Sequence, residues 1–122
     1  MRPELHEFAK ALVEHVRDRT IRSADGDLRP EAAGPVAERW RAAGVQRGDV
    51  VIPDVVDETI FSFLNAIDRG LLQLAFVSKD GTTVNLSEEG LGELGGWFMA
   101  SDGWRTTHSK ERFVDDFADM KE

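Results

Sequence analysis

The feature that most constrains the fold is the dipeptide Asp80-Gly81, which stands between two β-prone segments in residues 71–87, LLQLAFVSKDGTTVNLS. Asp-Gly is a strong signal for a tight turn that reverses one strand onto the next. We therefore predict an antiparallel hairpin with a two-residue turn, a geometry that pairs Val77 with Val84. The first strand is apolar on both of its faces, so we expect other elements to cover it on both sides.

A hairpin alone is only marginally stable in water, so helices must pack against it. Apolar residues recur at helical spacing over residues 3–20, 35–44 and 54–70, and they predict amphipathic helices there. In the third helix Asp54 is the expected N-cap. The broad apolar stripe of this helix consists of Val56, Ile60, Phe63, Leu64 and Ile67.

Two connecting segments are also assigned. Residues 23–35 are rich in Gly, Pro and Asp, and this composition predicts a loop. Residues 49–53 read DVVIP, which predicts a short strand ended by Pro53 that can join the hairpin as a third strand.

Gly90, Gly92 and Gly95 have the G-x-G-x-x-G spacing of a dinucleotide-binding loop. Such a loop receives a pyrophosphate at the start of the following helix, where Glu88 and Glu89 would place two negative charges. The predicted strand before the glycines is antiparallel, whereas the motif belongs to a βαβ unit. We therefore expect no nucleotide to bind here.

We predict instead that residues 88–99 form a helix capped by Ser87, in which the glycines have a packing role. Gly92 and Gly96 are four residues apart, so in a helix they would form a flat face pressed against another backbone element. The alternative, a glycine loop in place of a helix, stays open. A last helix is predicted to begin at Ser109, with Phe113, Val114, Phe117 and Met120 facing inward.

These elements indicate one globular domain over residues 1–122 of the α+β class. We expect about four helices packed on a small antiparallel β-hairpin or three-stranded sheet. Residues that can build its core are plentiful, because 41% of the chain is hydrophobic and it has seven Phe and three Trp.

Charge and cysteine content exclude several classes of function. The net charge is −8, the sum of +1 in residues 1–47 and −9 in residues 48–122, so nucleic acid and anionic membrane surfaces are unfavourable partners. With no cysteine there are no disulfides and no thiolate metal sites. The charged N-terminus and the lack of a long apolar run favour a cytoplasmic location.

No metal or cofactor is expected. Two acidic clusters have helical spacing, and we interpret both as solvated helix faces. They are Asp54, Asp57 and Glu58, and Asp115, Asp116 and Asp119.

The residues with most potential for binding are Glu93, Trp97, Trp104, Arg105 and His108. We predict a turn at Asp102-Gly103 between the two tryptophans. Two indoles, a cation and an imidazole near this turn can line a small-molecule pocket. Trp and Arg also dominate protein interfaces, and in that role Arg105 is expected to be exposed. The two tryptophans can equally be core residues.

No catalytic residue is assigned, because the chain has three histidines and no G-x-S-x-G nucleophile motif. Asp57 and Glu93 are the carboxylates that burial could tune into a base. We predict a small acidic, non-enzymatic protein-binding module of the adaptor or toxin-neutralising immunity type, with a basic partner and an oligomeric state left open. The alternative is a small-molecule-binding or enzymatic pocket protein that uses the Trp97–His108 loop.

Overall fold

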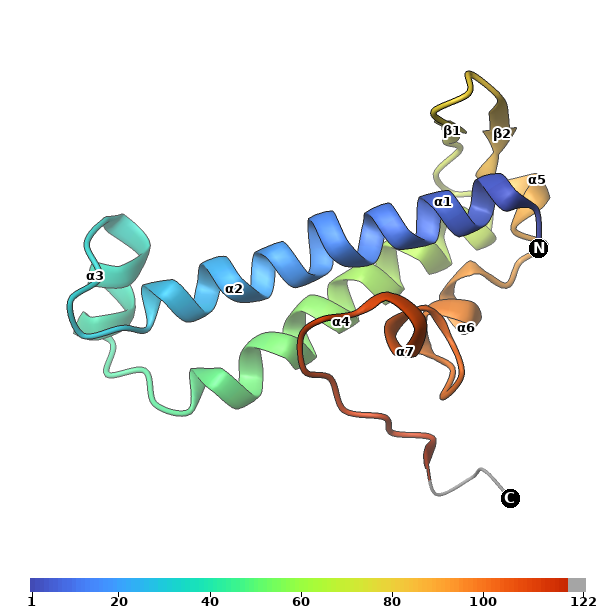
Figure 1. Ribbon diagram of the computed structural model, residues 1–122. Helices are drawn as coiled ribbons and strands as arrows, with labels where there is room; N and C mark the ends of the chain where they lie inside the picture. Colours follow the sequence, from blue (N-terminus) through green and yellow to red (C-terminus); the bar gives the residue numbers. More distant parts are fainter. Residues whose placement is uncertain (119–122) are drawn as a thin grey trace.

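The structure is a computed structural model that describes residues 1–118. Two long helical segments lie side by side (Figure 1). One is a continuous rod made of α1 (Pro3–Ala11), the π-helical turn η1 (Leu12–Arg17) and α2 (Asp18–Asp27), and the other is α4 (Gly48–Asp68). The short helix α3 (Pro35–Ala42) lies at the end where α2 turns back toward α4.

The remaining elements gather at the other end and on one side of the two long segments (Figure 1). They are β1 (Ala75–Val77), β2 (Thr83–Asn85), α5 (Leu86–Glu89), α6 (Leu94–Met99) and α7 (Trp104–His108). The mixed α+β class is therefore confirmed.

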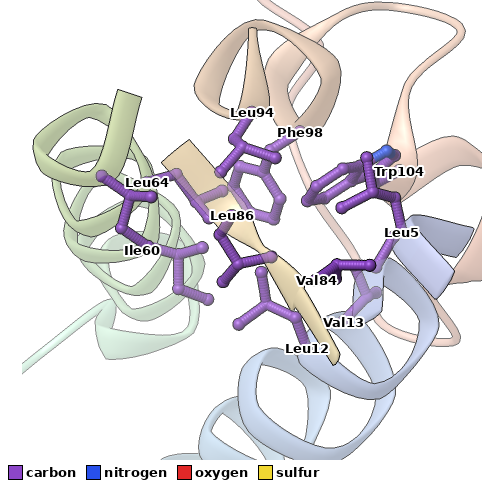
Figure 2. Packing of buried hydrophobic residues seen from close by; sticks show 12 residues of the cluster. Leu5, Leu12, Val13, Ile60, Leu64, Val84, Leu86, Leu94, Phe98 and Trp104 are labelled. Atoms are coloured by element: carbon purple, nitrogen blue, oxygen red, sulfur yellow. The ribbon is translucent and has the colours of Figure 1, made fainter. Parts of the chain in front are cut away.

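The core lies where α1, η1 and α4 meet the hairpin and the short helices (Figure 2). Its buried side chains come from every one of these elements except β1. Leu5, Val13, Leu64, Ile67, Leu94 and Phe98 are fully buried in it. The predicted apolar stripe of α4 is confirmed at Ile60, Leu64 and Ile67, whereas Phe63 is 39% exposed.

The first helix is longer than predicted, because residues 23–27 are helical and do not belong to a loop. Asp25 is held there by two hydrogen bonds from the guanidinium of Arg112, at 2.8 and 2.9 Å. In the middle of the rod the N–H of Asp18 donates to the carbonyl of Val13, five residues back. This π turn shifts the helical phase, so that Arg17 and Asp18 are both buried although they are adjacent in sequence.

The prediction of a strand at residues 49–53 is wrong, because these residues form the first turns of α4. The sheet in the described residues accordingly has two strands. Pro53 lies inside the helix and has no N–H to donate to the carbonyl of Asp49. Arg112 replaces that donor, with Nε and Nη2 at 3.0 and 2.8 Å from the Asp49 oxygen. Asp54 is not the N-cap, since the helix begins at Gly48.

The hairpin turns at Asp80-Gly81 as predicted, but its register differs by one residue. Phe76 faces Val84, and the N–H of Ser78 donates to the carbonyl of Thr82 at 2.8 Å. The loop therefore has three residues, with Gly81 in the left-handed region at φ +88°.

The predicted cover on both faces of the first strand is wrong. Phe76 packs edge-on against Phe8 of α1, with ring centroids 5.5 Å apart. On the opposite face Val77 is 61% exposed, and Leu71, Leu72 and Leu74 before the strand are exposed as well. The side chains of this strand are therefore covered on the Phe76 face and exposed on the Val77 face.

We expect Asp80 to titrate well below an ordinary aspartate. The hydroxyl of Ser78 and the N–H of Thr82 donate to its carboxylate, and these bonds lower the pKa of Asp80 from 3.8 to about 2. Because the folded pKa is the lower one, this carboxylate stabilises the loop above its unfolded pKa, and the effect is lost as pH falls toward 2. An NMR titration of the side-chain carboxyl measures the midpoint. In the Ser78→Ala variant the midpoint should rise, and a wild-type midpoint near 3.8 would contradict the hydrogen-bonded loop.

The predicted helix over residues 88–99 is wrong as a single element. Leu91 and Gly92 have positive φ, at +54° and +72°, and they separate α5 from α6. The alternative, a glycine loop, is therefore confirmed for the residues between α5 and α6. The N-cap of α5 is Asn85, whose side-chain oxygen accepts from the N–H of Glu88 at 3.0 Å, while Ser87 donates to the carbonyl of Ile67.

The proposed flat face of Gly92 and Gly96 is also wrong. Gly92 lies in the loop with no atom near its missing side chain, and Gly96 is exposed on α6. The closely packed glycine of α6 is Gly95, where an added Cβ would lie 3.1 Å from the ring of Phe61.

The predicted last helix is absent from residues 109–117. Ser109 instead ends α7, and its hydroxyl donates to the carboxylate of Asp18 at 2.9 Å. The segment crosses α4 and then turns away from it in an extended course (Figure 1). Of the residues expected to face inward, Phe113 is half-buried, Val114 and Phe117 are exposed, and Met120 lies outside the described residues. Asp115 and Asp116 of the predicted acidic cluster are therefore not helical, and Asp119 lies outside the described residues.

Candidate functional site

Three of the five predicted binding residues line one hollow of about 250 Å³. They are Trp97 of α6 and Trp104 and His108 of α7, and His6 of α1 lies opposite them. The two indole rings are tilted by 44° with centroids 6.3 Å apart. The edge of the hollow is completed by Met1, Ala100, Asp102, Gly103 and Thr107.

The turn between α6 and α7 brings the two indoles together. The N–H of Gly103 donates to the carbonyl of Ala100 at 2.9 Å, which confirms the predicted turn at Asp102-Gly103. A Cβ at Gly103 would lie only 2.1 Å from the carbonyl oxygen of Trp97. Glycine is therefore required for α7 to start this close to α6.

Two polar groups at the hollow have unusual surroundings. The indole N–H of Trp104 is buried, and none of the described residues accepts a hydrogen bond from it. Burial lowers the pKa of His108 below its usual value, and the nearby carboxylate of Glu14 opposes this shift.

The other two predicted residues do not join this hollow. Glu93 is exposed just before α6. Arg105 is only 2% exposed, so the expectation that it is an exposed interface residue is wrong. Its side chain points into the interior, where it pairs with Asp57 and donates to the carbonyl of Met99.

Arg105 belongs to a buried charge cluster that sequence analysis did not find. Its Nη1 lies 2.9 Å from Oδ2 of Asp57, and Nε of Arg17 lies 2.6 Å from Oδ1 of the same carboxylate. Arg17 also donates to Asp18 at 2.7 Å. One carboxylate thus joins two guanidinium groups from η1 and α7 across α4.

The segment after α7 closes this cluster. The ring of Phe113 lies 4.6 Å from the guanidinium carbon of Arg105 and 5.7 Å from that of Arg17. The carbonyl of Arg112 accepts from Nη2 of Arg17 at 2.7 Å. One sequence signal pointed to this arrangement: Arg17 lies four residues from Val13 and four from Ile21, within the apolar stripe of the first helix.

Asp57 is thus a structural ion-pair partner, with both of its oxygens accepting from arginine. The prediction that Asp54, Asp57 and Glu58 form a solvated helix face is therefore wrong for Asp57, which is buried. Asp54 and Glu58 are exposed as expected.

A third feature is the outer face of α4, which is turned away from the core. Val51 and Val55, one helical turn apart, are each 53% exposed. We define this face by its exposed residues, which are Val51, Asp54, Val55, Glu58, Thr59, Ser62 and Phe63. It includes two acids, and α4 has no Lys or Arg anywhere along its length.

Within residues 1–118, no helix is both long enough and apolar enough to cross a membrane. Comparisons with protein-family models, with curated proteins and with solved structures found no match. Function must therefore be argued from the geometry of these three features.

Proposed function

We propose that this chain is a small, non-enzymatic protein-binding module that docks a basic partner through the outer face of α4. The observation that carries the proposal is the combination, on one exposed helix face, of large apolar side chains and acids without any basic residue. Adaptor and toxin-neutralising roles are both forms of this function, and the identity of the partner distinguishes them.

The apolar side chains supply the contact area. Scattered exposed apolar residues are normal on protein surfaces. Here, however, Val51 and Val55 lie one turn apart on one exposed face of α4, and Phe63 lies further along the same helix. A gathering of this kind is typical of an interaction surface.

The acids supply selectivity for the partner. Asp54 and Glu58 flank Val55 on the outer face, and the chain as a whole carries a net charge of −8. A basic surface is attracted to such a face, which speeds its association and disfavours acidic competitors.

The test is affinity capture from the native cell lysate, followed by identification of the retained protein and measurement of its binding. The Val51→Ser/Val55→Ser variant should bind the captured partner at least about tenfold more weakly, since a truncated anchor residue typically costs more than 1 kcal/mol. Both side chains are more than half exposed, so the variant should keep its melting temperature.

Two further arms sharpen the experiment. Asp54→Asn/Glu58→Gln should weaken binding and reduce its dependence on salt, because it removes the charges that attract a basic surface. Leu91→Ser is the matched control, because Leu91 is 74% exposed but lies in the loop between α5 and α6. Equal capture by wild type and by the Val51→Ser/Val55→Ser variant would rule out the outer face of α4.

A further inference from the structure

A hollow of about 340 Å³ adjoins the outer face of α4 and shares two of its acids. Asp54 and Glu58 line the hollow from α4, and Asp116 lines it from the segment after α7, which crosses that helix (Figure 1). All three residues are exposed, and within residues 1–118 none of them forms an ion pair. Their carboxylates are therefore accessible to a partner.

The charges around this hollow attract a cation. Its lining has a net charge of −3, because four carboxylates oppose one guanidinium. That guanidinium belongs to Arg105, which is buried and paired with Asp57. Arg112, two residues before Val114 on the crossing segment, is paired with Asp25 and does not line the hollow. A cationic group of a partner therefore meets an excess of negative charge.

The apolar part of the lining favours a long organic cation. It consists of Phe61 from α4, Met99 from α6 and Val114 from the crossing segment. Phe61 is 38% exposed and Val114 is 55% exposed, so both are open to contact. Walls of this kind cover the methylene groups of an arginine or lysine side chain while its charged end stays beside the acids. Within residues 1–118 no group of three acids or imidazoles is arranged to hold a metal ion.

An arginine suits this arrangement better than a lysine. Its planar guanidinium has five N–H donors in a fixed fork, so it can donate to carboxylates from two elements at once. An ammonium group is a compact charge that is more strongly hydrated, so it loses more when it leaves water for a partly apolar hollow.

We propose that this hollow receives an arginine side chain of the basic partner. Asp54, Glu58 and Asp116 accept hydrogen bonds from the guanidinium, and the apolar walls cover the methylene groups. This inference rests on the proposed function and deepens it, because it assigns the partner residue that is recognised beside the outer face of α4.

The first experiment is an NMR titration of the ¹⁵N-labelled full chain with blocked tripeptides of arginine, lysine or citrulline. Citrulline has nearly the shape of arginine but no charge. The arginine peptide should shift the backbone amide signals of Met99, Val114 and Asp116 saturably, and it should bind more tightly than the lysine peptide. The citrulline peptide should leave these signals unchanged. If the lysine or the citrulline peptide binds as tightly as the arginine peptide, the proposal is overturned.

The Asp116→Asn variant tests the hollow separately from α4, since Asp116 lies on the crossing segment. It should weaken binding of the arginine peptide and of the captured partner by roughly two- to fivefold, the usual contribution of one exposed ion pair. Glu31→Gln is the matched control. It removes one negative charge from an exposed residue between α2 and α3 that does not line the hollow, so both affinities should stay unchanged.

The two proposals fail in different ways. If Val51→Ser/Val55→Ser weakens binding of the captured partner and Asp116→Asn does not, the partner docks on the outer face of α4 without using the hollow, and this inference is wrong. If Val51→Ser/Val55→Ser has no effect on that binding, the proposed function is wrong, and this inference fails with it.

Discussion

Replacing Asp57 with alanine is expected to destabilise the protein by roughly 3–5 kcal/mol, because breaking a buried ion pair leaves an uncompensated buried charge. Here the loss removes the only carboxylate that pairs with Arg105 within residues 1–118, while Arg17, also buried, keeps its ion pair with Asp18. A typical domain is stable by only about 5–15 kcal/mol, so the variant should lie close to the folding threshold. Urea denaturation monitored by circular dichroism measures the change.

The matched control is Asp54→Ala, three residues earlier on the same helix. Asp54 is exposed, so its removal should change the free energy of unfolding by no more than about 0.5 kcal/mol. The Asp57→Asn variant should fall between the two, because it keeps the shape of the side chain and loses its charge. If Asp57→Ala proves as mild as Asp54→Ala, the buried cluster does not hold η1, α4 and α7 together.

Replacing Gly103 with alanine is expected to destabilise the protein by roughly 1–3 kcal/mol, the usual effect of forcing extra volume into a packed site. The added Cβ would lie 2.1 Å from the carbonyl oxygen of Trp97 and 2.9 Å from that of Ala100. Both obstacles are backbone atoms, so the start of α7 must move away from α6. Near-ultraviolet circular dichroism should change as well, because the packing of Trp97 against Trp104 depends on this turn.

Gly96→Ala is the control for that prediction. Gly96 is exposed on α6, and its added Cβ would meet only the Glu93 carboxylate, at 3.6 Å. Alanine there should stabilise the helix by up to about 1 kcal/mol. Similar melting temperatures for Gly103→Ala and Gly96→Ala would show that the close approach at Gly103 has no energetic consequence.

The candidate sites were predictable to different degrees. The aromatic cluster was found from sequence, because Trp97, Trp104 and His108 are separated by a single short turn and local geometry brings them together. His6 was not assigned to it, since it comes from α1 at the opposite end of the chain. The burial of Arg105 was missed for a similar reason, because its partner Asp57 is 48 residues away.

By itself the sequence determined the features that depend on short-range spacing. These are the hairpin reversal at Asp80-Gly81, the apolar stripes of the two long helical segments, and the turn at Asp102-Gly103. Local patterns suffice there, because each rests on backbone preferences or on helical periodicity within a few residues.

Only the tertiary structure determined the features that depend on a hydrogen-bond or ion-pair partner far away in the sequence. Residues 49–53 read as a strand ended by proline, but they are helical, and Arg112 provides the hydrogen bonds that Pro53 cannot donate to Asp49. The same guanidinium holds Asp25 in the extension of the first helix. The buried guanidinium groups of Arg17 and Arg105 both pair with Asp57, which α4 places between them. Each of these contacts joins residues at least 40 positions apart, a separation at which no local pattern records the pairing.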